Sequence, residues 1–286
     1  EFRIREGAVW SDGKPVRAED FVTGLRRSLS PRVGSKLAGS LFPIRGARAH
    51  HSGKAVEGGL GVRAENGKLI IELEKPAPYF TQALTLPVAM AQRQDVLDAN
   101  AGRWPDTAPV TGPYRIVRHQ TERKIVLEKN PSYWNAAISS AAPRVEMTIV
   151  PDESAGLNLF EQGKMDILTK IPSTEFPRLR TAGLLRTDPF FATYYLSFNF
   201  RKGLFRDRDW RRAVLASLRR EELLAALDSG DTPARSWVPK GMEGYLPFYP
   251  QELAETFADS LAAVQKLPLP KTPVPAQFDS GTRNAL

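Results

Sequence analysis

Apolar residues in the first third of the chain follow helical and alternating spacings. Residues 1–5 read as a short strand, and a turn follows around Asp12-Gly13. A helix is predicted over 18–30, ending at Pro31, because apolar residues recur on one helical face: Phe21, Val22, Leu25 and Leu29. Asn66-Gly67 between β-prone arms predicts a hairpin over 62–73 with a type I′ turn. A short helix is expected over 79–86.

The middle of the chain predicts more strands and one helix. A strand pair is expected over 114–119 and 124–129, and alternation of apolar residues predicts a half-buried strand over 144–150. A helix over 154–163 would have Ser154 as its N-cap. A short buried strand is predicted over 165–168.

The last third begins with an aromatic strand and continues with helices. Tyr and Phe residues predict a strand over 193–200, and near-helical apolar spacing predicts a helix over 209–229. A further amphipathic helix is expected over 251–266. Residues 267–276 are rich in proline, which favours extended structure.

The element pattern indicates a mixed α/β chain in three parts. A loop over 98–109 gives the first boundary. The family resemblance described below implies the full division, into parts at 1–107, 108–200 and 201–286.

Composition narrows the class of protein. The 286 residues are 42% hydrophobic and 25% charged, which is typical of a globular protein, and the absence of Cys excludes a disulfide scaffold. No apolar stretch is long enough to cross a membrane. The net charge of +8 comes from scattered residues without a long basic run, which favours a solvated basic surface over a nucleic-acid-binding module.

Motifs for catalysis or metal binding are absent from the sequence. The histidines are His50, His51 and His119, and none stands in a zinc motif. Neither a phosphate-binding loop nor Gly-x-Ser-x-Gly occurs. We therefore expect no enzyme, no cofactor and no metal site, although a hydrolase with a triad from distant residues stays open.

Several short strings in a fixed order resemble the peptide-binding family of extracytoplasmic solute-binding proteins, which serve ATP-driven (ABC) importers. The strings are Trp10-Ser-Asp-Gly-Lys-Pro-Val16, Ala18-Glu-Asp-Phe21, Thr111-Gly-Pro-Tyr114, Asn130-Pro-Ser-Tyr-Trp134, Glu161-Gln-Gly-Lys-Met-Asp-Ile167, Tyr194-Tyr-Leu-Ser-Phe-Asn199 and Gly241-Met-Glu-Gly-Tyr245. The resemblance covers nearly the whole chain. These strings are mostly architectural, so Trp10 and Trp134 are expected to be core or turn residues.

The resemblance implies a fold and a function. The fold would be two α/β lobes with mixed sheets that close on a ligand by hinge motion. The ligand would be an oligopeptide that pairs its backbone with protein strands. Ligand-binding residues would come from two stretches near the hinge: Ile171, Ser173, Thr174, Thr193, Tyr194, Tyr195 and Asn199.

The resemblance also leaves alternatives and gaps. Within the family the solute could instead be a metal chelate, haem, a sugar or an opine. The partner would be a membrane permease, and the protein would be a monomer, periplasmic or lipid-anchored outside a bacterial cytoplasmic membrane. Family features expected before the first strand and in the second lobe are missing, so the chain reads as incomplete at both ends. Arg17 also stands where a helix-capping Thr is expected.

Overall fold

The computed structural model describes residues 1–54, 58–135, 142–188, 190–201, 203–227, 230–234 and 236–246. The chain divides into two compact units, Glu1–Val150 and Pro151–Leu286. This division differs from the expected boundaries at 107 and 200, and the three-part organisation stays a prediction. The helix expected over 251–266 and the proline-rich stretch after it lie outside the described residues.

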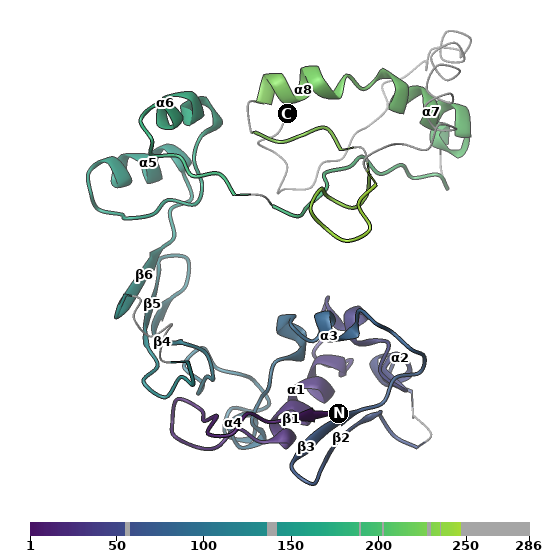
Figure 1. Ribbon diagram of the computed structural model, residues 1–286, viewed down its shortest axis with the longest axis vertical. Coiled ribbons are helices and arrows are strands. Elements are labelled where there is room, and N and C mark those ends of the chain that lie inside the picture. Colours follow the sequence, from purple (N-terminus) through teal and green to yellow (C-terminus); the bar gives the residue numbers. More distant parts are fainter. Residues whose placement is uncertain are drawn as a thin grey trace. The chain divides into compact units, whose positions relative to one another are not determined.

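The first unit carries two three-stranded antiparallel sheets and several helices (Figure 1). One sheet has the order β1-β3-β2 and the other β4-β5-β6. The elements, with 3-10 helices marked η, are β1 Phe2–Arg3, α1 Ala18–Leu29, η1 Ala38–Leu41, α2 Ala47–His51, β2 Val62–Glu65, β3 Lys68–Ile71, α3 Phe80–Ala83, η2 Pro87–Ala89, α4 Gln94–Ala99, β4 Tyr114–Gln120, β5 Lys124–Lys129 and β6 Arg144–Thr148.

The predicted hairpin forms with the predicted turn. β2 and β3 pair from Val62 opposite Ile71 to Glu65 opposite Lys68, which leaves two residues in the loop. Those residues, Asn66 and Gly67, have φ of 50° and 73°, the left-handed values that a type I′ turn requires.

Helix α1 covers the first sheet and buries its apolar face there (Figure 1). Leu25 and Leu29 are fully buried with Leu41, Ile44 and Val62. Gly24 lies against the segment that follows η2, and a Cβ atom at this position would stand 2.1 Å from the Met90 carbonyl oxygen. Only the hydrogen of glycine fits this crossing of backbone and helix.

Arg17, the N-cap residue of α1, has no side chain that can cap the helix, and the Asp20 carboxylate binds the helix start instead. The Arg17 side chain makes no capping bond, but the Asp20 carboxylate accepts the Arg17 backbone N–H at 3.0 Å. The same carboxylate oxygen accepts the Nε1–H of Trp10 at 2.9 Å, and Trp10 is only 2% exposed. The expectation that Trp10 is a core residue is therefore confirmed. Trp134, in contrast, is half exposed and stacks under the Arg5 guanidinium, whose carbon lies 3.9 Å from the ring centre.

The second sheet forms where the patterning predicts it, with one difference in burial. β4, β5 and β6 pair antiparallel, and Val126 on the central strand is buried. Met147 on β6 and Ile149 beyond it are exposed. The expectation of a half-buried strand is wrong for these two residues because β6 lies at the edge of the sheet.

The regular elements that the structure describes in the second unit are all helices. Its elements are α5 Glu153–Glu161, η4 Ser173–Glu175, α6 Phe176–Thr181, η5 Gly203–Arg206, α7 Arg208–Ser217 and α8 Arg220–Leu227. α5 is capped by Asp152, whose carboxylate accepts the Ala155 N–H at 2.7 Å. The expected cap, Ser154, lies inside the helix because a carboxylate two residues earlier takes the capping position.

Three further expectations in this unit are wrong. The single helix over 209–229 is two helices, since Leu218 adopts extended backbone and the Ser217 hydroxyl donates to the Val214 carbonyl. Residues 165–168 form no strand. Residues 193–200 form no strand, and residues 236–246 meet them through the Thr193 hydroxyl and a ring contact rather than a ladder.

Replacing Gly24 with Ala tests the crossing of α1 and the Met90 segment. Alanine has the better helix propensity, yet the overlap with the Met90 carbonyl should lower the free energy of unfolding by about 1–3 kcal/mol. Urea unfolding followed by circular dichroism measures the change in unfolding free energy. Gly39→Ala is the control, because nothing lies within 4 Å of a Cβ there and its φ is not positive. Equal stability of the two variants would contradict the prediction.

Replacing Asp20 with Ala tests the buried carboxylate. The Trp10 indole and the Arg17 N–H would both lose their acceptor, so we expect a loss of about 2–4 kcal/mol. A double-mutant cycle with Trp10→Phe should show that the two losses are not additive. Additive losses would mean that the indole bond does not contribute.

Candidate functional site

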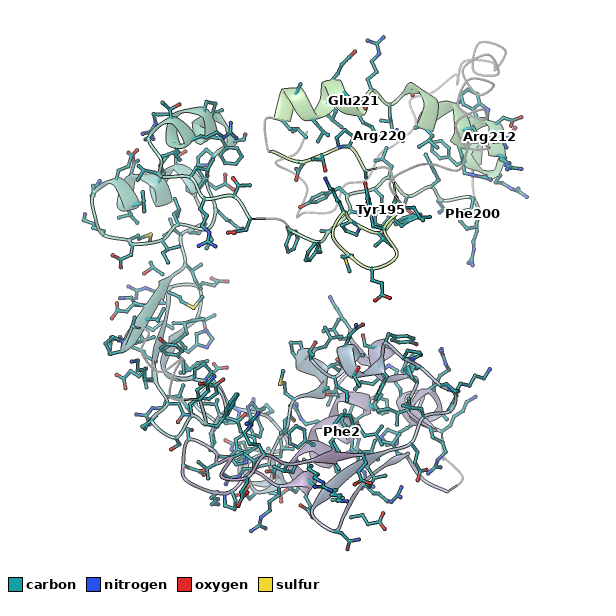
Figure 2. The ribbon with its side chains drawn as sticks, viewed as in Figure 1. Phe2, Tyr195, Phe200, Arg212, Arg220 and Glu221 are labelled. Carbon is teal, nitrogen blue, oxygen red and sulfur yellow. The ribbon has the colours of Figure 1, made fainter. Side chains whose placement is uncertain are left out.

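Four of the residues expected to bind ligand, Thr193, Tyr194, Tyr195 and Asn199, lie on an exposed aromatic segment. Tyr194 and Tyr195 are 71% and 64% exposed, and Phe200 on the same segment is exposed as well (Figure 2). An exposed tyrosine offers an apolar face and a hydroxyl to a ligand. Thr193 is half-buried between them and Phe191.

A second segment, 236–246, holds the first one in place. The Thr193 hydroxyl donates to the Trp237 carbonyl oxygen at 3.1 Å. The rings of Tyr195 and Trp237 meet edge to face, with centroids 4.8 Å apart and an interplanar angle of 62°. A Cβ on Gly241 would stand 3.2 Å from the Phe191 ring, so the two segments touch at three points. We call Phe191, Tyr194, Tyr195 and Trp237 the aromatic surface.

Trp237 is the residue that sequence reasoning missed. It is 72% exposed, which is unusual for an indole that no ligand covers. Its neighbours Ser236 and Pro239 mark a loop in the sequence, and a Trp in such a loop is the signal that could have found it.

The other residues expected to bind ligand lie outside the aromatic surface. The Asn199 side-chain oxygen accepts the Arg201 N–H at 3.1 Å, which is a local turn. Ser173 and Thr174 are exposed on η4, and Ile171 before them is half-buried. No hydrogen bond or ring contact among the described residues joins this group to the aromatic surface. Whether either group binds ligand stays a prediction.

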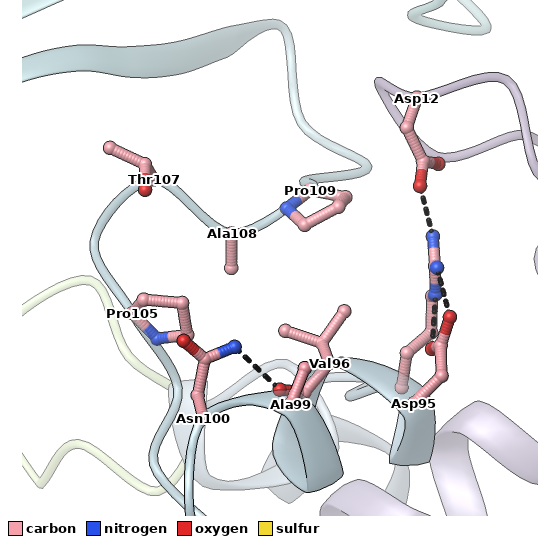
Figure 3. A pocket seen from close by; sticks show the side chains of 10 residues that line it. Asp12, Asp95, Val96, Ala99, Asn100, Pro105, Thr107, Ala108 and Pro109 are labelled. Carbon is pink, nitrogen blue, oxygen red and sulfur yellow. Dashed lines mark hydrogen bonds and ion pairs between the residues drawn. The ribbon is translucent and has the colours of Figure 1, made fainter.

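The first unit has an open pocket of about 400 Å³ beside α4 (Figure 3). Asp12 and Asp95 approach the buried Arg93 from two sides, and the wall is completed by residues that follow α4, among them Asn100, Pro105 and Thr107. Arg93 Nε donates to Asp95 at 2.9 Å and Nη1 donates to Asp12 at 2.5 Å. Lys14 Nζ also contacts Asp95, at 2.8 Å. Each guanidinium nitrogen of Arg93 donates to a carboxylate. The guanidinium therefore stabilises the pocket wall and is not free to bind a ligand.

This ion network lowers the pKa values of the two carboxyl groups that belong to it. Hydrogen bonds from Arg93 and then Lys14 hold the pKa of Asp95 well below its ordinary value. Burial alone would raise the pKa of Asp12, but hydrogen bonds from Arg93 and the Lys14 N–H outweigh it, so this pKa is also lowered. The carboxylates of Asp95 and Asp12 raise the pKa of Arg93 in turn.

Groups for metal binding or nucleophilic catalysis do not gather in the described residues. No cluster of three or more His, Cys, Asp or Glu side chains occurs there. His119 contacts the Asp106 carboxylate through Nδ1 at an exposed position, and the His51 ring Nδ1 lies 3.3 Å from the Leu29 carbonyl oxygen. In the same part of the chain, no helix has both the length and the hydropathy to cross a membrane.

Comparison with known proteins places the chain among binding proteins. Residues 1–267 match the family model described as bacterial extracellular solute-binding proteins, family 5 middle. The chain is 30% identical over 273 residues to the probable deoxycholate-binding periplasmic protein YgiS of Escherichia coli, covering 93% of this chain and 51% of that protein. It is 30% identical over 256 residues to the oligopeptide-binding protein OppA of Bacillus subtilis, covering 85% and 46%.

The fold agrees with the same family. The solved structure of OppA from Burkholderia pseudomallei superposes with a TM-score of 0.77 at 28% identity, covering 93% of this chain and 54% of that one. The predicted fold class and family are therefore confirmed. The chain spans about half the length of the curated relatives that it matches.

Replacing Arg93 with Gln tests the ion network. Asp12 and Asp95 would lose their main partner, and the unfolding free energy of the first unit at pH 7 should fall by roughly 1–3 kcal/mol. In the parent chain the lowered acid pKa values contribute stability above about pH 4, and it is lost as pH falls through the folded-state values. The two chains should therefore converge in stability at low pH, as measured by urea unfolding across a pH series. A constant difference between the chains at every pH would contradict this.

Proposed function

Because the chain belongs to the family 5 bacterial extracellular solute-binding proteins, we propose that it is part of the substrate-binding subunit of an ABC importer. Its task is to capture a solute, foremost an oligopeptide, and deliver it to a membrane permease. The observation that carries the peptide assignment is the segment 193–200, which belongs to no helix or strand and exposes aromatic side chains.

Backbone pairing is the way in which this segment would hold a peptide. Residues 193–200 belong to no helix and no sheet ladder, and we infer that a peptide pairs its backbone with this segment as an added strand. Main-chain bonds of this kind are indifferent to the ligand's sequence. A binder built this way accepts many peptides.

The aromatic surface would supply the contacts with side chains. Tyr195 and Trp237 form a rigid edge-to-face pair, and Thr193 fixes the backbone beneath it through the Trp237 carbonyl. Flat aromatic faces favour apolar and aromatic side chains of varied shape. Thr174 and Ser173 on η4 offer hydroxyls, and we assign them and Ile171 to the same ligand, together with Tyr194 and Asn199.

A second solute class is supported by one relative. The name of YgiS gives deoxycholate as its ligand, and this chain is as similar to YgiS as to OppA of Bacillus subtilis. A steroid acid is a flat apolar body with a carboxylate, and aromatic faces suit such a body. We therefore keep a non-peptide amphiphile as the alternative ligand.

The protein would have no catalytic role. The protein would act outside the cytoplasmic membrane, free in the periplasm or held by a lipid anchor, and as a monomer that docks with its permease. Several relatives, YgiS among them, are periplasmic proteins by name, which supports this location.

Truncating the aromatic surface tests the site. In calorimetric titrations with a mixture of tri- to pentapeptides, Tyr195→Ala and Trp237→Ala should each weaken binding about fivefold, which corresponds to about 1 kcal/mol of lost aromatic contact. Tyr79→Ala is the matched control, because Tyr79 is an exposed tyrosine of the first unit. Unchanged affinity in both site variants would remove the aromatic surface from the proposal, and binding of deoxycholate in place of peptides would favour the alternative solute.

A further inference from the structure

Tyr195 and Trp237 form an open aromatic corner in the second unit. Their rings meet edge to face, with centroids 4.8 Å apart and an angle of 62° between the planes. Both side chains are more than half exposed, so most of each ring faces solvent. Exposed apolar groups that lie together mark binding sites, whereas single exposed ones are common on any surface. The corner therefore offers two ring faces against which a compact apolar group can pack.

The loop that carries Trp237 is held on both sides of the indole. Before Trp237, the Ser236 hydroxyl oxygen accepts the Val238 N–H at 3.2 Å. After it, the Pro239 carbonyl oxygen accepts the Met242 N–H at 3.2 Å, which closes a turn. The loop thus fixes Trp237 before a ligand arrives, and a preorganised site loses less conformational entropy on binding.

The free polar atoms of the corner are hydrogen-bond donors. In the part of the chain that the structure describes, no hydrogen bond reaches the Trp237 indole N–H or the Tyr195 hydroxyl. An indole N–H can only donate, and a phenol hydroxyl can donate as well. The Trp237 carbonyl oxygen, in contrast, already accepts the Thr193 hydroxyl at 3.1 Å. The corner therefore suits a ligand group that brings a carbonyl oxygen and needs no acceptor.

Proline is the amino acid that combines these properties. Its ring is compact and apolar, and it has no backbone N–H that would need an acceptor. The carbonyl group of the residue before it is a hydrogen-bond acceptor. Aromatic-lined grooves in other proteins recognise proline-rich segments in this way. A leucine or a phenylalanine would also pack on the corner, but each would bring an N–H with it.

We propose that Tyr195 and Trp237 bind a proline residue of the captured peptide, so that the site selects peptides with proline at one position. This inference rests on the proposed peptide-binding function and names the residue type that the corner prefers. The proline ring packs against the Tyr195 and Trp237 faces. The indole N–H donates to the carbonyl oxygen of the residue before the proline.

A proline at this position is compatible with backbone pairing to segment 193–200. In an added strand, the N–H groups of alternate residues point toward the protein and toward solvent. A proline at a solvent-directed position removes no interstrand hydrogen bond, whereas a proline at the next position removes one. Proline should therefore strengthen binding at one position of the peptide and weaken it one residue to either side.

Fluorescence anisotropy with labelled pentapeptides tests this preference on the full chain. The series starts from a peptide of alternating serine and leucine and replaces one residue at a time by alanine, proline or N-methylalanine. N-Methylalanine lacks the N–H, as proline does, but has no ring, so it separates the two contributions. At one position proline should bind about fivefold more tightly than alanine, because its ring packs on the aromatic faces. N-Methylalanine at that position should bind no more tightly than alanine.

Variants of Trp237 show whether the preference arises at the corner. Trp237→Ala should lower the ratio of the alanine and proline dissociation constants to about one. Trp237→Phe keeps an aromatic face and loses the indole N–H, so it should keep part of the ratio. Trp134→Ala is the matched control, because Trp134 is an exposed tryptophan of the first unit, and it should keep the full ratio. A ratio separates selection for proline from a general loss of affinity.

Each other outcome overturns the inference. Binding of every peptide without a preference for proline would do so and would leave the proposed binding function intact. A ratio that is unchanged in Trp237→Ala, or lowered equally in Trp134→Ala, would mean that the preference does not arise at the corner. Equal gains from proline and N-methylalanine would mean that the ring does not contribute. If no peptide of the series binds, the peptide assignment of the proposed function fails together with the inference.

Discussion

The buried carboxylate of Asp20 is the interaction on which the first unit depends. One oxygen of this side chain accepts both the Trp10 indole and the Arg17 backbone N–H, so it ties the turn at residues 10–14 to the start of α1. The Asp20 backbone carbonyl accepts the Gln92 N–H at 2.9 Å, which adds the segment after η2. A buried carboxylate is costly unless it is fully hydrogen-bonded, and here it replaces the cap that Arg17 does not provide.

Further contacts spread outward from this point. The Trp10 and Trp104 rings meet at a tilt of 49° with centroids 6.0 Å apart, and Ser11 exchanges two hydrogen bonds with Val110. The loop that leads into β4 is thereby fixed to the turn before α1. One helical turn beyond Asp20, Gly24 allows the Met90 backbone to cross α1 closely. The Arg93 network then holds α4 to the same turn through Asp12, so residues far apart in sequence share one rigid region.

The second unit differs from the first in the exposure of its large apolar side chains. Most of its large apolar side chains at 190–200 are exposed, as is Trp237, and the two segments that carry them meet through one hydrogen bond and a few ring contacts. Exposed aromatic side chains with little core beneath them favour a surface made to be covered by another molecule.

The sequence by itself determined the local elements whose signals are short-range. The Asn66-Gly67 turn, the helix ending at Pro31 and the strands of β4 and β5 all follow from neighbouring residues, because backbone φ preferences and apolar periodicity act locally. The ordered strings from Trp10 to Tyr245 determined the family. Tertiary structure alone decided that the Met90 backbone crosses α1 at Gly24, that Met147 lies on an edge and that residues 193–200 form no ladder. It also decided that Trp237 meets Tyr195, since these features depend on contacts between residues distant in the chain.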